Sequence, residues 1–323
     1  MLARGGAQVQ IEYTMKALAH IGVEADHLQW WNSQQTGDIL HQVGLIPQHL
    51  IRLAQANGWR VANTVLFTET CNRSRWSLLL RAFLIRPTLS IPLPFALRAS
   101  LHWQTYHLTD QMIVGLQAER DLLLDVYGVA PEKVSVVPLG LSETFLNAGP
   151  PLRTEEHLIC TGRIIESKNS VELAQLALVA KVPILFVGKA ADPSGQYWHK
   201  FRSLIDGKYV KYRDYVAGES AVAELLRQAR GYVLMSQYEN WCLAAHEAAA
   251  CGLPLLLPDQ RWSRERFGNQ ALYWPRGRNK AAGIAALQSF WEQCPKLPPP
   301  KIQFFSWIDV AEQLRDVYSR ILR

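Results

Sequence analysis

The sequence predicts an α/β protein built from two Rossmann-like, doubly wound domains. Short apolar runs alternate with longer helical patterns along most of the 323 residues, which is typical of a parallel sheet covered by helices. These runs are apolar throughout rather than at every second position, as in strands that are buried on both faces. The stretch LNAGPPLRTEEH (146–157) is rich in proline, glycine and charge, and is expected to link the two domains.

The second half of the chain shows the alternation most clearly. NSVELAQLALVAK (169–181) is typical of a helix that Asn169 or Ser170 can cap, and ESAVAELLRQARG (219–231) of a helix that ends at Gly231. Strands are predicted at 157–163, 182–190, 207–215, 231–237 and 253–259, and all but the charged stretch 207–215 are mainly apolar runs.

The first half is less regular but similar. Helices are predicted at 10–22 and 118–128. A doubly wound domain normally opens with a strand, a glycine turn and a helix. Here the turn ARGGAQ (3–8) has no apolar strand before it, so we expect the first strand to be missing, because the true start lies upstream or because the chain was truncated. Candidate strands lie at 23–29, 38–44, 60–68, 110–116 and 133–140.

Composition and charge narrow the class of protein. The chain is 49% hydrophobic and 19% charged, which is typical of a globular protein with well-formed cores. A net charge of +6 suits anionic ligands such as nucleotides, or an anionic membrane face, but is equally compatible with no such partner. Lysine and arginine are dispersed along the sequence and no recognised nucleic-acid-binding motif occurs, so nucleic acid is not an expected partner.

The cysteines and the lack of long apolar runs indicate the compartment. Five cysteines occur without a CxxC spacing, which favours a reducing compartment and argues against a disulfide scaffold or a zinc site. The histidines are scattered and there is no DxD motif, so no metal or other cofactor is expected. No apolar run is long enough for a membrane span and the first residues lack a signal-peptide core, so we expect a cytoplasmic protein.

Two glutamates, Glu239 and Glu247, define the predicted site. Ligands of open α/β sheets bind beyond the carboxyl ends of the strands, and Glu239 closely follows the apolar run YVLM. The free N–H groups of the next helix, from about Trp241 to Ala244, suit a phosphate. Glu247 comes about one turn later among small and apolar neighbours, where an ionised carboxylate needs hydrogen bonds that a ribose could supply. The alternative is that Glu247 faces solvent from a half-exposed helix.

Cations and glycines are expected around the same crevice. Arg163 and Lys168 follow the first strand of the second half, where they could neutralise a diphosphate, although each alone is more often a solvated surface charge. Gly188 ends the next strand, at a position where a side chain would crowd a ligand. Gly5 and Gly6 could approach from the other domain. Together these residues predict a nucleotide diphosphate held in a cleft between two domains.

The motifs resemble those of the GT-B-fold retaining glycosyltransferases of family four, in glycosyltransferase group 1, which transfer a sugar from a nucleotide-sugar donor. The resemblance implies an acceptor-binding domain at 1–147, a donor-binding domain at 153–305 and a helix at 306–323 that crosses back to the first domain. It implies a retaining hexosyltransferase in polysaccharide or glycolipid biosynthesis. The matching segments span nearly the whole chain: GGAQ, DILHQVG, KVSVVPLGL, TGRIIESKN, ILFVGKA, ENWCLAAHEAAACGLP and FSWIDVAEQLRDVY.

The resemblance also implies roles for single residues. Glu239 would contact hydroxyls of the donor sugar, and Glu247 the ribose. Arg163 and Lys168 would bind the diphosphate and stabilise its charge as it leaves. The acceptor would be a glycan, a lipid-linked molecule or a small molecule, and no metal would be required. Tyr212 and Arg213 would lie near the base. The full set of other implied donor-binding residues is Gly5, Gly6, Gly162, Gly188, Tyr212, Arg213, Asn240, Trp241, Cys242 and Leu243.

The chain departs from the family pattern at several positions. Asn240 and Cys242 stand where glycine is frequent, Asn169 where glycine is common, and Leu139 where asparagine is usual. The departures keep open a non-catalytic protein that binds a nucleotide sugar. A nucleotide-sugar epimerase would share the fold and the pocket. A nicotinamide dehydrogenase is not favoured, because GGAQ is not GxGxxG.

The segment 72–98 combines five arginines with an apolar and aromatic stripe. This pattern suits a helix in a lipid interface, so the segment is a candidate for peripheral contact with the inner face of the membrane. The alternative is a core helix whose arginines lie on its wet face. Pro87, Pro92 and Pro94 are expected to limit the helix to about three turns.

Overall fold

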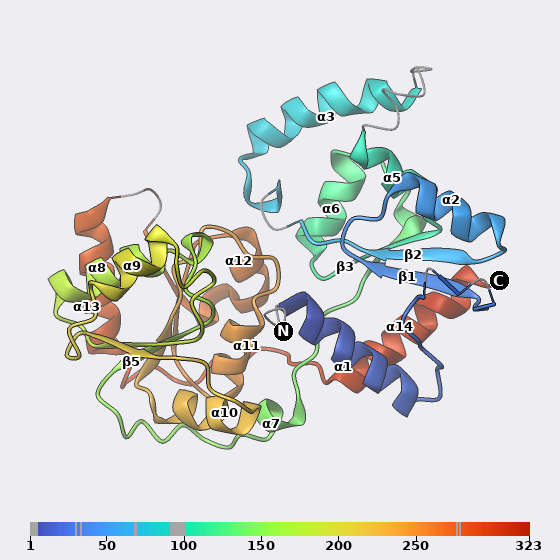
Figure 1. Cartoon of the computed structure of the whole chain (residues 1–323). Coiled ribbons are helices and arrows are strands. Elements are labelled where there is room, and N and C mark those ends of the chain that lie inside the picture. Colours follow the sequence, from blue (N-terminus) through green and yellow to red (C-terminus); the bar gives the residue numbers. More distant parts are fainter. Residues whose placement is uncertain are drawn as a thin grey trace. The chain divides into compact units, whose positions relative to one another are not determined.

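The computed structural model describes residues 6–29, 31–32, 34–67, 70–90, 101–275, 277 and 279–323. It contains two compact units, each with a parallel sheet covered by helices, which confirms the predicted fold class (Figure 1). The first unit is Met1–Gly140 with Phe305–Arg323, and the second is Leu141–Phe304. The first unit ends earlier than expected because α7 (Glu143–Leu146) packs on the helices of the second.

The sheet of the first unit has four parallel strands in the order β1-β2-β3-β4. Ala62 lies opposite Gln111 and Val114 lies opposite Val136 in this register. Successive residues point to opposite faces of the sheet, so Ala62 and Ile113 enter one core cluster, and Met112 and Val114 enter another. The strands are β1 (Ile39–Val43), β2 (Arg60–Thr64), β3 (Gln111–Val114) and β4 (Val134–Val136).

Helices cover both faces of this sheet. α1 and α14 lie side by side on one face, with Trp307, Val310 and Leu314 of α14 buried. At Gly140 a Cβ atom would lie 2.8 Å from the Trp307 backbone, so only glycine permits α14 to approach this closely. The helices of this unit are α1 (Gly6–His20), α2 (Gln48–Ala56), α3 (Arg75–Ser90), α5 (Thr105–Leu108), α6 (Gln117–Asp125) and α14 (Trp307–Ile321).

The sheet of the second unit has six parallel strands in the order β10-β9-β8-β5-β6-β7. The chain runs from β5 outward to β7, returns to β8 beside β5, and continues outward to β10. This reversal is a topological switch point, the place where doubly wound sheets bind ligands. The strands are β5 (Leu158–Thr161), β6 (Ile184–Val187), β7 (Val210–Arg213), β8 (Gly231–Val233), β9 (Leu255–Leu257) and β10 (Leu272–Tyr273).

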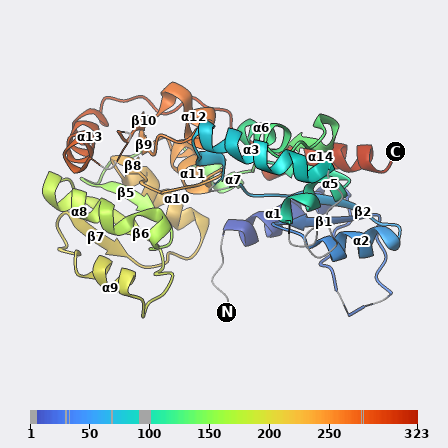
Figure 2. The ribbon, with the colours of Figure 1, turned by 90° about the horizontal axis from the view of Figure 1, so that it is seen from above.

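Helices on both faces complete the second unit, as Figures 1 and 2 show. α8 packs against α13 on one face, and α10 packs against α11 on the other. α8 is nearly all apolar, because it lies between α13, α9 and the sheet. The helices are α8 (Ser170–Ala180), α9 (Gln196–Arg202), α10 (Glu219–Gln228), α11 (Leu243–Ala250), α12 (Arg261–Phe267) and α13 (Lys280–Gln293).

Several predicted elements were wrong. Residues 23–29 form no strand. Gly231 does not end α10 but begins β8, where a Cβ atom would lie 3.1 Å from Phe290. α1 begins at Gly6, earlier than expected, and Gly5 lies outside the described residues. α3 continues past Pro87 to Ser90, so it is longer than three turns. In the part of the chain described, no helix is both long enough and apolar enough to cross a bilayer.

Candidate functional site

The loops that follow β5 and β8 are joined at the switch point of the second unit. The backbone N–H of Gln237 donates to the Ser167 carbonyl at 2.8 Å. The Asn169 amide donates to the Met235 carbonyl at 2.9 Å, and the Gln237 amide donates to Asn169 Oδ1 at 2.9 Å. These bonds hold the segment before α8 against the segment before α11, which brings together residues about seventy positions apart in the sequence.

Lys168 and Glu239 form an ion pair between these two loops. The side chains are 27% and 12% exposed, so the pair is largely buried but still accessible to solvent. Burial favours a lower pKa for Lys168, but the charge of Glu239 and its hydrogen bond overcome this effect and raise the pKa of Lys168. The lysine is therefore a fixed cation with a partner that an anionic ligand could replace.

The start of α11 presents backbone N–H groups beside this pair. The N–H groups of Leu243 and Ala244 have no acceptor among the described residues. The preceding residue, Cys242, is buried and takes a left-handed conformation with φ 57°. Free N–H groups in the first turn of a helix carry partial positive charge and suit a phosphate.

His246 stabilises the start of α11 through a hydrogen bond to the Cys242 backbone. Arg266 Nε donates to His246 Nε2 at 3.3 Å, so Nδ1 carries the proton and donates to the Cys242 carbonyl at 3.0 Å. Burial lowers the pKa of His246 to about 3, and the charge of Arg266 adds to the effect. The ring is therefore neutral at physiological pH, and it stacks on Trp241 with centroids 4.9 Å apart.

Glu247 lies about one turn into α11 and is half-buried. Burial, together with the negative charge of Glu219, raises the pKa of Glu247 to about 7. Its carboxyl group makes no hydrogen bond or ion pair with any residue that the structure describes. A half-buried carboxylate of this kind would be stabilised by a ligand that donates hydrogen bonds, such as a diol.

Arg163 and two glycines lie at the carboxyl ends of β5 and β6. The Arg163 side chain is exposed and makes no ion pair within the described ranges. Gly162 has φ 141°, and a Cβ atom there would meet nothing within 4 Å. At Gly188 a Cβ atom would lie 2.2 Å from the Gly162 carbonyl oxygen. A side chain at Gly188 would therefore clash with the protein itself, and the expected closeness of Gly188 to a ligand stays a prediction.

The remaining predicted donor-binding residues lie on β7, just before α11 and at the start of α1. Tyr212, on β7, donates to the Gly188 carbonyl at 3.0 Å, and the neighbouring Arg213 is exposed. Asn240 is half-buried, whereas Trp241 is buried and its indole Nε1 has no hydrogen-bond partner among the described residues. Gly6 belongs to the first unit, at the start of α1.

The structure adds two residues that the sequence did not indicate. Gln260, at the start of α12, donates from its amide to the carbonyls of Ser236 at 3.0 Å and Gln237 at 2.6 Å. Gln237 in turn connects the two loops. In the sequence, Gln260 directly follows one predicted strand and Gln237 ends another, which is their only signal. Among the described residues, no group of three or more His, Cys, Asp and Glu side chains could hold a metal ion.

Comparisons with known proteins agree with the fold. Residues 155–292 match the family model described as glycosyl transferases group 1. No curated protein matches the chain. A similar solved structure is that of the pneumococcal O-GlcNAc transferase GtfA in complex with UDP and GlcNAc, with a TM-score of 0.59 and 14% identity. That match covers 86% of this chain and 55% of GtfA, so this chain spans little more than half the length of that protein.

Two further solved structures match over almost the whole of this chain. The lipopolysaccharide outer core galactosyltransferase WaaB, in its apo form, has a TM-score of 0.58 and 12% identity, and covers 98% of this chain and 83% of its own. Anabaena HepE, in complex with UDP and glucose, has a TM-score of 0.51 and 14% identity. That match covers 98% of this chain and 96% of HepE. The chain therefore has the GT-B fold of these glycosyltransferases, and residues 155–292 match the glycosyltransferase group 1 family model.

Proposed function

We propose that the chain is a glycosyltransferase that moves a sugar from a nucleoside diphosphate sugar to an acceptor. The observation that supports this most directly is the Lys168–Glu239 pair, which lies at the switch point beside the free N–H groups of α11. The family match over residues 155–292 agrees with this proposal. UDP in the complexes of GtfA and HepE makes a uridine nucleotide the first donor to test.

The charges of the site suit the departure of a diphosphate. When the donor sugar separates from its diphosphate, negative charge develops on the leaving oxygen. Lys168, Arg163 and the N–H groups of Leu243 and Ala244 would stabilise that charge, and preorganised donors of this kind can lower a barrier by several kcal/mol. Glu239 would exchange its bond with Lys168 for hydroxyls of the donor sugar, so the lysine becomes available to the phosphate as the donor binds.

Glu247 and Tyr212 would bind the nucleoside. A ribose has two adjacent hydroxyls, and the Glu247 carboxylate has no competing partner among the described residues. Tyr212 and Arg213 would lie near the base. Transfer with retention of anomeric configuration, to a glycan, lipid-linked or small-molecule acceptor, rests on the resemblance of the motifs. No residue named here requires a metal for these roles.

A two-stage experiment tests the proposal. A thermal-shift screen of nucleoside diphosphates and their sugars identifies the donor, because a ligand that binds only the folded state raises Tm. Transfer is then measured with the stabilising donor, and NMR of the product determines its anomeric configuration. We expect Lys168→Ala and Glu239→Ala to abolish transfer while the control Lys200→Ala, an exposed lysine on α9, keeps it. Full activity in the two site variants would overturn the role assignment.

A further inference from the structure

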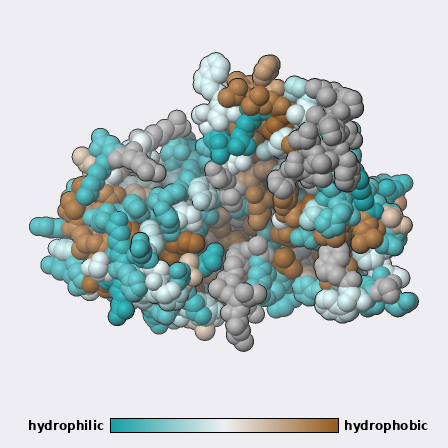
Figure 3. All heavy atoms as spheres, turned by 45° about the horizontal axis from the view of Figure 1, so that its top comes forward, coloured by the Kyte–Doolittle hydropathy of each residue, from teal (hydrophilic) through white to brown (hydrophobic). Residues whose placement is uncertain are grey.

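The outer face of α3 is apolar. Five large side chains on it are strongly exposed, and their spacing of three and four residues places them on one side of the helix. Figure 3 shows this face as a hydrophobic area. We call these residues the α3 face: Trp76 (82% exposed), Leu79 (60%), Leu80 (61%), Phe83 (75%) and Leu84 (61%).

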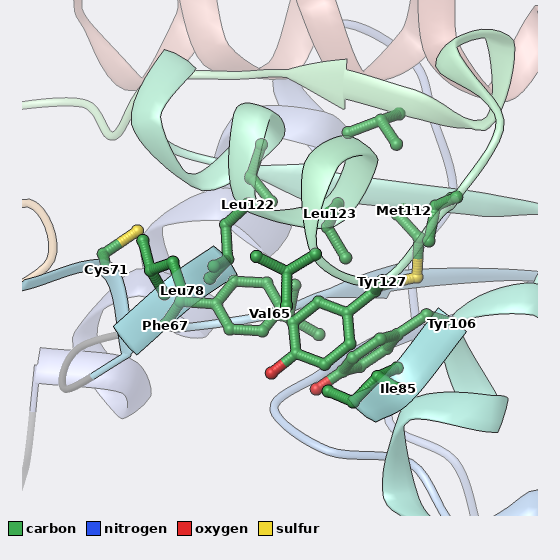
Figure 4. Packing of buried hydrophobic residues seen from close by; sticks show 14 residues of the cluster. Val65, Phe67, Cys71, Leu78, Ile85, Tyr106, Met112, Leu122, Leu123 and Tyr127 are labelled. Carbon is green, nitrogen blue, oxygen red and sulfur yellow. The ribbon is translucent and has the colours of Figure 1, made fainter. Parts of the chain in front are cut away.

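The opposite side of α3 is apolar as well and is already occupied. Leu78 and Ile85 are buried in the core cluster of the first unit, close to Phe67 and Tyr106 (Figure 4). The α3 face is therefore not the surface by which the helix packs on its own domain. A helix that is apolar on both sides is typical of one with a second, non-aqueous environment. The alternative of a core helix holds for this buried side, whereas the exposed side carries mainly apolar side chains instead of the expected arginines.

The charged residues of α3 and of the segment just before it are all basic. Residues 70–90 contain four arginines and no aspartate or glutamate. Arg81 lies near Tyr127, and Arg86 is exposed and donates to the Leu124 carbonyl at 3.3 Å. A hollow of about 540 Å³ lies between α3 and α6, lined by Leu79, Ala82, Phe83, Arg86, Pro87 and Asp125. Asp125 is the acidic group of this lining, and it comes from α6 rather than from α3.

We propose that the α3 face docks on the surface of an anionic lipid bilayer, with the helix parallel to the membrane and its side chains in the boundary between headgroups and acyl chains. Leucine, phenylalanine and tryptophan on one side and arginine beside them match this environment. At 16 residues the helix is about 24 Å long, which is too short to span the hydrocarbon core and sufficient to lie in its interface.

A second copy of the chain fits the α3 face less well. In a symmetric dimer the same surface of each copy meets its counterpart. Contact through α3 would therefore place one segment with four arginines and no acidic residue against another, and like charges would oppose the contact. Anionic lipid headgroups attract the same arginines, so the charge distribution favours the bilayer.

Vesicle flotation of the full chain tests the proposal. We expect the protein to float at low ionic strength with vesicles of phosphatidylcholine and phosphatidylglycerol in equal amounts, and much less with phosphatidylcholine alone. Trp76→Ser with Phe83→Ser should reduce the partition coefficient roughly tenfold or more, because each substitution removes a large apolar side chain from the lipid. The matched control is Trp31→Ser with Leu53→Ser, since Trp31 is also 82% exposed and Leu53 is 53% exposed, and both lie outside α3.

Other outcomes would overturn the proposal. If the protein does not float with either vesicle, or if both double variants float like the parent chain, the α3 face is not a membrane surface. If light scattering shows a dimer that only the Trp76→Ser, Phe83→Ser variant dissociates, and the parent does not float, a second copy covers the face instead. The proposal does not depend on sugar transfer, and unchanged Tm and nucleotide binding in the variants would show that both units remain folded.

Discussion

Two residues beside the candidate site hold the backbone in a conformation that favours glycine. φ is 51° at Asn169 and 57° at Cys242. Residues other than glycine pay about 1–2 kcal/mol in this region, and asparagine enters it most readily. Asn169 also gains two hydrogen bonds that join the loops of the site. The resemblance of the motifs implies glycine at both positions, and glycine readily adopts such a left-handed backbone.

Cys242 allows a test of this backbone strain. Cys242→Ala and Cys242→Gly both remove the buried thiol, but only the glycine variant relieves the left-handed conformation. We expect Cys242→Gly to be more stable than Cys242→Ala by roughly 0.5–1 kcal/mol, because the relief exceeds the entropy that glycine loses on folding. Urea unfolding of the two variants measures the difference. A more stable alanine variant would show that φ at this position is not strained.

Glu247 makes stability depend on pH. Its pKa is about 7 in the folded protein against a usual value of 4.5. As pH rises between these values the unfolded chain loses its proton first, so the folded state is progressively destabilised, and the cost is complete above about pH 7. Because the group is half-buried and solvent screens it, we expect the cost to be about 1–2 kcal/mol.

Glu247→Gln removes this titration. The variant should gain stability over the parent chain between pH 5 and pH 8, as measured by urea unfolding, and its affinity for the nucleotide should fall. Glu224→Gln, an exposed glutamate on α10, is the control and should show no pH-dependent gain. A constant difference between Glu247→Gln and the parent at all pH values would show that this carboxyl group titrates normally.

The main residues of the candidate site could be predicted from the sequence, but the residues that hold their loops in place could not. Arg163, Lys168 and Glu239 could be placed at one edge of a sheet, because strand ends can be identified from apolar runs. Their roles stay a prediction. Gln260 and His246 could not be found, because their contacts depend on how loops from separate strands meet in space.

At the scale of elements, patterns of burial explain which predictions succeeded. Strands such as Ile184–Val187 and Leu255–Leu257 are buried on both faces, so their unbroken apolar runs identified them. Residues 23–29 include Glu24, Asp26 and His27 and gain no partner strand, so strand propensity alone was insufficient. The role of Gly231 could not be predicted, because the need for glycine comes from Phe290 of α13, far away in the sequence.

Glu119 determines how α6 begins. Its side chain is fully buried, and its carboxylate accepts hydrogen bonds from the N–H groups of Phe67 at 3.1 Å, Gly115 at 3.0 Å and Leu116 at 3.2 Å. These bonds connect the loop after β2 with the start of α6. A negative charge at the start of a helix also interacts favourably with the helix dipole.

Glu119→Gln should destabilise the protein by about 2–4 kcal/mol. The amide would direct an N–H group towards backbone donors, leaving at least one buried N–H group without an acceptor. Asp121→Asn on the same helix is the control, because Asp121 is exposed, and we expect it to change stability by less than about 0.5 kcal/mol. Equal unfolding midpoints in urea for the two variants would show that the Glu119 bonds add little.

At the scale of the whole molecule, the two units differ in how the chain forms them. The second unit is one continuous segment, Leu141–Phe304, whereas the first is completed only by Phe305–Arg323. α14 supplies Trp307, Val310 and Leu314 to the core of the first unit, so that unit depends on a helix that follows the second in the sequence. The sequence predicted this return from the resemblance of FSWIDVAEQLRDVY, since apolar periodicity alone does not show which domain a helix contacts.

The continuous second unit should fold by itself and bind the nucleotide. Its six-stranded sheet is covered on both faces by its own helices, and it contains Lys168, Glu239 and Glu247. We expect a fragment of residues 141–304 to give a dispersed NMR spectrum and to bind the nucleoside diphosphate of the donor less than about tenfold more weakly than the full chain in calorimetry. It should transfer no sugar, because the first unit, which is proposed to bind the acceptor, is absent. The same fragment with Lys168→Ala is the control and should lose nucleotide binding. A folded fragment without affinity for nucleotides that the full chain binds would show that the first unit supplies essential donor contacts, and would contradict the assignment of donor binding to the second unit.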